Sequence, residues 1–196
     1  MNLVEDRTRA IELADEWMRV GAVFLDTETT GLGPDAEMCD LGIVDGSGRI
    51  LFNSLIKPTK PIPADVSLVH HITNEMVEYA PTLLDVLPAV DMLLRQCPAV
   101  VTYNAKYDWG IWVQSARAHN LDANNIIPAL RPWECAMTAY SQFYGEWNPR
   151  RGSYRWHKLS AAAAQCGIYV PDGLHRAIVD ADLTRRVVMH MAAQQE

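Results

Sequence analysis

Residues 22–31 read Ala-Val-Phe-Leu-Asp-Thr-Glu-Thr-Thr-Gly and place two acids, Asp26 and Glu28, at the end of a short apolar run. The apolar residues indicate the start of a buried strand. Residues i and i+2 of a strand project from one face, so Asp26 and Glu28 are expected side by side. Buried like charges raise each other's pKa unless a cation lies between them, and their uncompensated burial is costly. The stretch therefore predicts a divalent-metal site with oxygen ligands, to which further acids contribute.

The composition of the chain is that of an ordinary globular protein. Its 196 residues suit one domain, and 49% of them are hydrophobic and 21% charged. Lys and Arg number 17 against 24 Asp and Glu, a formal charge of −7. This balance argues against a passive, sequence-independent coat for nucleic acid, which is usually basic. An enzyme acting on phosphodiesters is still allowed, because bound metal ions invert the local charge.

The four cysteines are scattered, without a CxxC pair or zinc-type spacing, and are expected to be reduced thiols in a cytosolic protein. The N-terminal residues lack the apolar segment of a signal peptide. No run approaches the ~20 apolar residues of a membrane span. We therefore expect a soluble, cytoplasmic protein with no membrane association. The sequence does not indicate an oligomeric state.

The pattern along the chain is that of a single α/β domain, in which strands come first and then a strand and helices alternate. Residues 1–20 are expected to form an N-terminal helix packed on a domain of residues 21–196. Asp45-Gly46-Ser47-Gly48 is a strong hairpin signal between two strands. After the first acidic strand, further strands are expected at residues 39–44, 49–56 and 99–103. Helices are expected at residues 8–19, 64–69, 74–77, 82–95, 107–118, 134–144, 157–166 and 177–193.

Three details of this pattern are specific enough to test. Pro88 should kink or split the helix that Thr82 caps, because proline lacks the backbone donor. Residues 57–63 contain three prolines and are expected to form a loop. Residues 145–154 are expected to be a polar, aromatic loop.

Further acids follow the second buried strand and lie near the C-terminus. Asp108 comes five residues after residue 103, and Asp180 lies on a helix that His175 precedes. Ligands of open α/β sheets gather at the carboxyl ends of strands, where Asp26, Glu28 and Asp108 all fall. A histidine with an ordinary pKa of ~6.5 is suited to take a proton from water at neutral pH.

Three segments of the chain together resemble the motifs of the DEDD exonuclease family, in its histidine (DEDDh) branch. They are Asp26-Thr27-Glu28-Thr29-Thr30-Gly31-Leu32, the segment from Tyr103-Asn104 to Tyr107-Asp108, and His175 followed after four residues by Asp180. The branch includes the proofreading epsilon subunit of bacterial DNA polymerase III, ribonuclease T and oligoribonuclease. Residues 69–82 also resemble an epsilon-like stretch, except that His71 stands where the family usually has glycine. That departure concerns a backbone turn more than the chemistry.

The resemblance implies a ribonuclease H-like fold, a mixed five-stranded sheet flanked by helices. It also implies two Mg²⁺ or Mn²⁺ ions held by four carboxylates, since hard cations prefer oxygen ligands. By this resemblance Asp26 bridges both ions, Glu28 and Asp180 complete the first site, Asp108 serves the second, and His175 is the general base.

Other residues near these motifs are candidates for contact with substrate. They are Thr27, Thr29, Leu32, Asn104 and Trp109. The resemblance makes Leu32 a candidate wedge against the terminal base. Trp109 either packs in the core, which is favoured, or stacks on a base. His70 and His71 are more simply packing residues than metal ligands.

Residues 147–158 interleave aromatic residues with arginines, a histidine and a lysine. Such a composition is typical of a single-strand contact surface, which pairs phosphate charge with base stacking. A solvated connecting loop explains the same composition. The sequence leaves both interpretations open.

The function that this pattern predicts is metal-dependent hydrolysis of single-stranded nucleic acid from the 3′ end, releasing nucleoside monophosphates. DNA is favoured as the substrate, because residues 69–82 are epsilon-like, and RNA trimming is the alternative. A non-catalytic nucleic-acid-binding module is disfavoured, because all four acids and the histidine are present. A small-molecule phosphohydrolase would use the same metals but would lack an open groove. A DNA polymerase or a replication or repair protein is a candidate partner.

Overall fold

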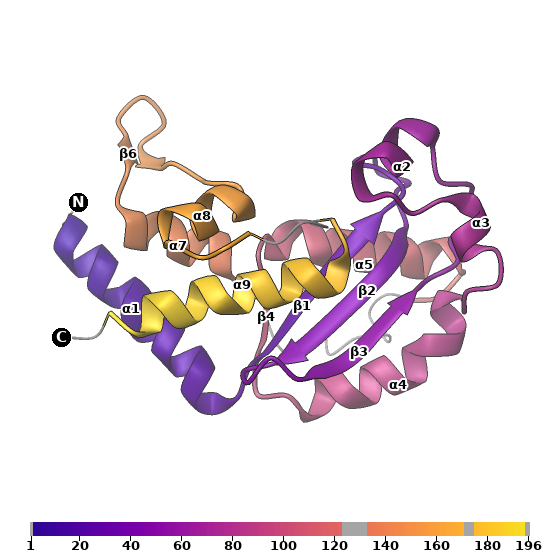
Figure 1. The fold of residues 1–196 in the computed structure, drawn as a ribbon, viewed down its shortest axis with the longest axis horizontal. Coiled ribbons are helices and arrows are strands. Elements are labelled where there is room, and N and C mark those ends of the chain that lie inside the picture. Colours follow the sequence, from indigo (N-terminus) through magenta and orange to yellow (C-terminus); the bar gives the residue numbers. More distant parts are fainter. Residues whose placement is uncertain (1, 123–132, 171–174, 195–196) are drawn as a thin grey trace.

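A five-stranded mixed sheet forms the centre of the molecule (Figure 1). The computed structural model describes residues 2–122, 133–170 and 175–194. The strand order is β3-β2-β1-β4-β5; β1 pairs antiparallel with β2 and parallel with β4. This is the sheet that the resemblance implies. Its strands are β1 (Val23–Thr29), β2 (Met38–Asp45), β3 (Ile50–Leu55), β4 (Val100–Thr102) and β5 (Glu134–Cys135).

Helices cover both faces of the sheet. One face carries α1 (Leu3–Val20), α7 (Ala136–Tyr144), α8 (Leu159–Gln165) and α9 (Ala177–Ala192). The other face carries α4 (Leu83–Gln96) and α5 (Ala105–Ala118). Two short helices, α2 (Ala64–His70) and α3 (Asn74–Val77), follow β3, and a small hairpin of β6 (Trp147–Asn148) and β7 (Ser153–Tyr154) follows α7.

The core consists of two main apolar clusters, separated by the sheet, and β1 contributes to both. Phe24 belongs to the cluster under α9, whereas Val23 and Leu25 belong to the cluster under α5. Because side chains alternate along a strand, this assignment directs Asp26 and Glu28 to the α9 face. The fold thus fixes the position of both acids before any polar contact is considered.

Three details of the elements differ from the sequence-based expectation. Helix α4 continues through Pro88, because a capping box of Thr82 and Asp85 starts it and its buried face, which includes Val90, anchors it to the core. Glu134 and Cys135 pair with β4 as an edge strand instead of starting a helix. The expected loop of residues 145–154 contains the β6–β7 hairpin.

Most other elements begin and end close to the expected residues. Helix α1 starts five residues earlier than expected, where the Asn2 side chain accepts a hydrogen bond from the backbone N–H of Glu5. His71 ends α2 in the left-handed conformation (φ 61°), at the position where a glycine is usual in the resembling family. Among the described residues, no helix combines the length and apolar character needed to cross a membrane.

Candidate active site

Strand β1 presents Asp26 and Glu28 on the face that α9 covers. In the antiparallel pairing with β2, Asp26 lies opposite Gly42 and Glu28 lies opposite Asp40. The two acids are two positions apart on one regular strand, so their side chains project in the same direction. This is the arrangement that the sequence predicts.

The first turn of α9 brings a third acid and a histidine to the same place. Ligand atoms of Glu28, His175 and Asp180 all lie within 4.8 Å of one another. The backbone N–H of His175 donates to Asp180 Oδ2 at 3.3 Å. Asp180 Oδ1 is buried and has no hydrogen-bond partner among the described residues. His175 itself is exposed and has a positive φ of 72°, a conformation that few non-glycine residues adopt.

Helix α5 contributes the fourth acid from the opposite face of the sheet. Asp108 is only 3% exposed, and its Oδ1 accepts a hydrogen bond from Thr27 Oγ1 at 3.0 Å. Thr27 precedes Glu28 on β1 and points to the α5 side. The hydrogen bond therefore links the second helix to the strand that carries the other acids.

The four carboxyl groups repel one another electrostatically. Burial raises the pKa of Asp26 well above its ordinary value, and the charges of Asp108 and Asp180 raise it further. Burial and the charge of Asp180 raise the pKa of Glu28 to about 8. Burial raises the pKa of Asp108 to about 7, although the hydrogen bond from Thr27 acts in the opposite direction. Burial also raises the pKa of Asp180.

A divalent cation fits this group of side chains. The donors are carboxylate oxygens, which hard cations prefer. A positive charge placed among them would offset the repulsion that raises the pKa values of Asp26 and Glu28. The unpartnered Oδ1 of Asp180 supplies a buried oxygen that lacks a hydrogen-bond donor in the described part of the protein. The donor atoms and the mutual repulsion of the four carboxyl groups therefore both fit a divalent cation.

Asp40 is a further acid beside the site, and the sequence analysis missed it. It is fully buried on β2, where its Oδ2 accepts hydrogen bonds from Arg176 Nε at 2.8 Å and from the backbone N–H of Ala177 at 3.2 Å. Both donors come directly after His175. Asp40 thus holds the start of α9 against the sheet. The available signal was an acid inside an otherwise apolar strand, residues 38–44.

Gly42 allows α9 to lie directly on β2. A Cβ atom at this position would lie 2.3 Å from the backbone nitrogen of Ile178, far inside van der Waals contact. Since Gly42 pairs with Asp26, the closest approach of helix and strand occurs next to the acids. The sequence pattern gave no indication of this contact.

A cavity of about 600 Å³ adjoins Glu28 and is bounded on its far side by α2. Thr27, Thr29 and Leu32 line it, as does Tyr107. Both threonines are largely buried, and the hydroxyl of Thr29 lies 2.8 Å from the Tyr107 hydroxyl. Leu32 is 89% exposed. Of the three predicted substrate residues here, Leu32 therefore has the most freedom to touch a ligand.

A second cavity of about 540 Å³ lies on the other side of Leu32 and Tyr107. Asn104, another predicted substrate residue, lines it. Trp109 does not line either cavity, because its ring packs edge-on against Trp133, with the ring centroids 5.5 Å apart. The favoured core position of Trp109 is thus the observed one.

His70 has a structural place in the wall of the first cavity. Its Nδ1 accepts a hydrogen bond from the backbone N–H of Ile72 at 3.0 Å, and its Nε2 lies 3.2 Å from the carbonyl oxygen of Thr29. A neutral ring with the proton on Nε2 satisfies both contacts. Burial lowers the pKa of His70, which favours this neutral form. His70 thus supports the end of β1, as expected of a packing residue.

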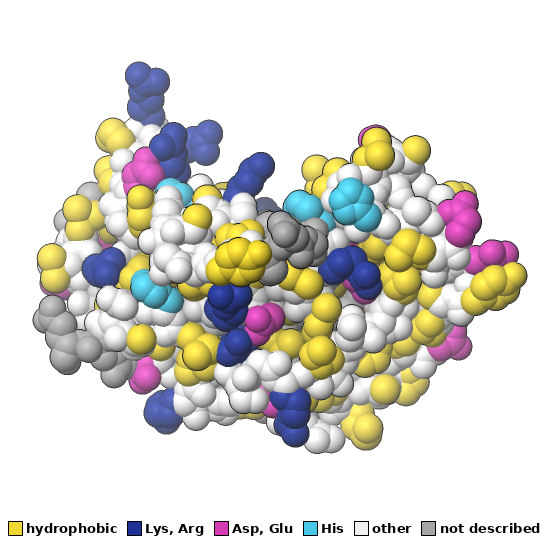
Figure 2. Space-filling view, viewed as in Figure 1, with side chains coloured by type: hydrophobic (Ala, Val, Ile, Leu, Met, Phe, Trp, Pro, Cys, Tyr) yellow, Lys and Arg dark blue, Asp and Glu magenta, His cyan; other side chains and the backbone are white. Residues whose placement is uncertain are grey.

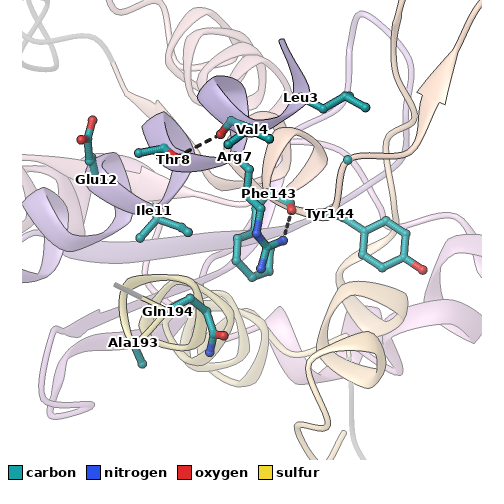
Figure 3. Close-up of a pocket in the computed structure, with 11 residues that line it drawn as sticks. Leu3, Val4, Arg7, Thr8, Ile11, Glu12, Phe143, Tyr144, Ala193 and Gln194 are labelled. Atoms are coloured by element: carbon teal, nitrogen blue, oxygen red, sulfur yellow. Dashed lines mark hydrogen bonds between the residues drawn. The ribbon is translucent and has the colours of Figure 1, made fainter. Parts of the chain in front are cut away.

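A larger cavity of about 1040 Å³ lies at the opposite end of α9 from Asp180 (Figure 3). Its walls come from α1, the end of α7 and the end of α9. Arg7 crosses it, with its guanidinium 4.0 Å from the centroid of the Phe143 ring. Glu12 is the acid among its lining residues, and the cluster of carboxylates lies elsewhere. Cavity size alone would therefore select a site away from the four carboxylates.

Comparisons with known proteins agree with this geometry. A family model described as an exonuclease, of the RNase T type, matches residues 23–188. The uncharacterized exonuclease CP81 of Escherichia phage 186 is 41% identical over 180 residues, which cover 91% of this chain and 92% of the phage protein. Exodeoxyribonuclease 10 of Escherichia coli K12 is 25% identical over 171 residues, which cover 85% of this chain and 66% of that protein.

Solved structures share the fold. The nuclease domain of 3′hExo, described as a DEDDh family member and crystallised with rAMP, has a TM-score of 0.71 and 19% sequence identity. The match covers 89% of this chain and 92% of that domain.

Proposed function

This chain belongs to the DEDDh family of 3′–5′ exonucleases, and from that premise we propose that it degrades single-stranded DNA with two divalent cations and with His175 as general base. The enzyme class, a phosphodiesterase that works from the 3′ end, follows from family membership, as does dependence on a divalent metal. The polymer, the number of ions and the role of each residue are the proposal.

The main support for the proposal is that Glu28, His175 and Asp180 lie close together in space. Their ligand atoms lie within 4.8 Å of one another although the residues lie at opposite ends of the sequence. A strand end and a helix start are rigid elements, which hold a reacting centre more accurately than loops do. Asp26 shares the strand with Glu28, and Asp108 reaches the site from α5.

We assign the metal ligands as the family resemblance implies. Asp26, Glu28 and Asp180 would hold one ion, and Asp26 and Asp108 would hold the other. When bound, the ions supply an activated water and positive charge beside the phosphate. The hydrogen bond from Thr27 orients Asp108, and the backbone N–H of His175 orients Asp180.

His175 is suited to the remaining task, the removal of a proton from the attacking water. Its side chain is exposed at the edge of the acid cluster, and an imidazole nitrogen is the most common general base in enzymes. Water attacks the terminal phosphorus as His175 accepts the proton. The bond from phosphorus to the 3′ oxygen of the preceding nucleotide breaks, that oxygen takes up a proton from solvent, and a nucleoside 5′-monophosphate leaves.

DNA is the favoured polymer for two reasons. Residues 69–82 are epsilon-like, and exodeoxyribonuclease 10 is named for DNA. RNA trimming is the second candidate, because the 3′hExo domain was crystallised with rAMP. The two differ in whether the site accepts a 2′-hydroxyl.

The test is degradation of matched single-stranded DNA and RNA that carry a 5′ label, with Mg²⁺ or Mn²⁺. We expect a ladder that shortens from the 3′ end, faster on DNA, and absent with EDTA or in the Asp26→Ala variant. Preference for RNA would overturn the choice of polymer. No degradation of either strand by the intact protein would refute the exonuclease function.

A separate variant tests the role of His175 as general base. His175→Ala should lower kcat by about 100-fold or more, because general-base catalysis contributes about 10²–10⁴-fold. Divalent metal ions should still raise the Tm of this variant, since the four carboxylates are unchanged. A variant as active as the parent would remove His175 from the mechanism.

A polymerase or repair partner also stays a prediction, which rests on the epsilon-like stretch of residues 69–82. Co-elution of this protein with a bacterial replicative DNA polymerase on size-exclusion chromatography would support it. Separate elution at micromolar concentrations would count against a stable complex.

A further inference from the structure

The β6–β7 hairpin stands away from the rest of the molecule as a basic arm. Figure 1 shows the hairpin and α2 rising on either side of the sheet, and Figure 2 shows a hollow between these two projections. Lys and Arg side chains gather on the hairpin side of this hollow. We define the arm as residues 147–158, which include Arg150, Arg151, Arg155 and Lys158.

The arm is held in a fixed conformation. At its tip, the Asn148 side chain accepts hydrogen bonds from the backbone N–H groups of Arg150 and Arg151, at 3.0 and 3.2 Å. At its base, the Tyr154 hydroxyl donates to Asp6 of α1 at 2.7 Å. The Trp147 and Tyr154 rings pack edge to face, with centroids 5.2 Å apart. These contacts fix the backbone at the tip and at the base of the arm.

The charges at the tip have no internal counter-charge. Arg150 and Arg151 are exposed, and neither forms an ion pair within residues 2–122, 133–170 and 175–194. Arg155, lower on the arm, pairs with Glu146 at 2.6 Å. The whole chain carries a charge of −7, so an approaching polyanion is repelled except where such local positive charge exists.

Three cavities lie between the acid site and the arm, and each shares lining residues with the next. The cavity beside Glu28 shares Leu32 and Tyr107 with the second cavity. The second cavity in turn shares Trp156 with a third, of about 530 Å³, which Arg151 and Arg155 line. Trp156 is 67% exposed. We call this series of three cavities, which begins beside Glu28 and ends against Arg151 and Arg155 of the arm, the track.

We infer that single-stranded nucleic acid upstream of the cleaved end follows this track, with a base against Trp156 and its phosphates on Arg150 and Arg151. The inference rests on the exonuclease function proposed above and adds a binding surface to it. Arginine suits phosphate through paired N–H donors, and an exposed indole stacks on any base. The arm thus supplies the affinity for a polymer that the acidic body of the protein lacks.

Binding without cleavage tests this surface directly. The probe is a labelled oligothymidylate of about 20 nucleotides, followed by fluorescence anisotropy in EDTA over a range of salt concentrations. For single strands, the slope of log K against log salt changes by about 0.7 per phosphate contact. The Arg150→Ala/Arg151→Ala variant should therefore lower the slope by about 1.4 and weaken binding about tenfold or more.

A matched control removes the same charge elsewhere. Arg19 and Arg117 are exposed, form no ion pair with other described residues, and end α1 and α5 away from the track. Arg19→Ala/Arg117→Ala should leave the slope within experimental error. A Trp156→Ala variant should weaken binding about fivefold or more with the slope unchanged, because stacking carries no charge. Equal losses in the arm variant and the control would overturn the proposal.

Activity on a dinucleotide tests the nucleic-acid track separately from the exonuclease function on which it rests. Arg150 and Arg151 line neither the cavity beside Glu28 nor the second cavity, so the arm variant should hydrolyse a dinucleotide like the parent and lose activity only on long strands, through KM. If the parent degrades nothing, the exonuclease function fails, while anisotropy still reports whether the arm binds. Equal impairment on dinucleotide and long strand would show that the arm variant damages the acid site, and would refute the track.

Discussion

Arg176 Nε lies 2.8 Å from Asp40 Oδ2 and so ties the residue after the proposed base to the centre of the sheet. Asp40 is fully buried, whereas 37% of the Arg176 side chain is exposed. The same Asp40 oxygen also accepts the backbone N–H of Ala177, which opens α9. The positive φ of His175 is thus maintained by contacts on its C-terminal side as well as by Asp180.

Removal of this ion pair should lower turnover more than substrate binding. In Arg176→Ala, Asp40 is left buried without its cation, and we expect a loss of roughly 1–3 kcal/mol in the free energy of unfolding. Because His175 loses its anchor, kcat should fall about tenfold or more while KM changes little. Steady-state kinetics and urea denaturation measure the two effects.

The double variant Asp40→Asn/Arg176→Ala separates position from stability. A neutral amide needs no counter-charge, so this variant should recover most of the unfolding free energy and remain slow. Recovery of both stability and kcat would show that the ion pair acts only on folding.

Gly42→Ala should separate α9 from β2. The added Cβ meets backbone atoms of Ala177 and Ile178 at 2.3 to 2.5 Å, and backbone cannot move aside as a flexible side chain can. We expect a loss of about 1–3 kcal/mol or more, together with loss of activity. Gly110→Ala is the matched control, because Gly110 lies inside α5 with no atom within 4 Å of the added Cβ. That control should gain about 0.5–1 kcal/mol in urea denaturation.

Asp26→Asn should stabilise the metal-free protein while it abolishes catalysis. The amide removes one charge from a cluster in which burial and neighbouring carboxylates raise the pKa of Asp26. We expect a gain of about 1–2 kcal/mol in EDTA, or roughly 2–8 °C in Tm. Added Mg²⁺ or Mn²⁺ should raise the Tm of the parent and have little effect on the variant. The exposed Asp35→Asn should change neither value, and an equal gain there would contradict the role of the cluster.

Asp45 should give a pH-dependent contribution to stability that is independent of the active site. Its carboxylate accepts hydrogen bonds from the backbone N–H and hydroxyl of Ser47 and from Arg49, which lower its pKa from 3.8 to about 2. Because the pKa of Asp45 is lower in the folded protein, the ionised carboxylate stabilises the fold at pH values above its ordinary pKa. That stabilisation disappears as the pH falls from about 4 to about 2.

Asp45→Ala should therefore be less stable than the parent by about 1 kcal/mol at pH 7, a modest figure because the side chain is partly exposed. The difference should shrink towards zero at pH 2. Urea midpoints at both pH values measure it. A difference that stays constant with pH would assign the effect to the turn backbone instead of the charge.

Local pattern was sufficient for much of the fold and for part of the candidate site. Alternation along residues 22–29 predicted one face for Asp26 and Glu28, whereas the pairing of His175 with Asp180 in one site came from the family resemblance. The first prediction depends on neighbours in sequence, whose relative directions a strand determines. The mixed sheet itself also came from the family resemblance.

Contacts between distant segments were not predictable in the same way. The pair of Asp40 and Arg176 depends on the register of β2 against β1 and on where α9 packs on the sheet. Neither the register nor the position of the helix can be read from a single sequence. Pro88 shows the reverse case: a local rule predicted a break, and the buried face of α4 overrode it. Trp109 likewise adjoins a proposed metal ligand in sequence but belongs to the core in space.

The placement of α9 also has a consequence for when the enzyme becomes active. Strand β1 carries two of the acids and is translated before α9, whereas His175 and Asp180 are translated only after all five strands of the sheet. A growing polypeptide therefore cannot assemble the cutting centre until its late helix has docked over Gly42. A polypeptide that stops before His175 lacks two of the five proposed site residues and should not degrade nucleic acid.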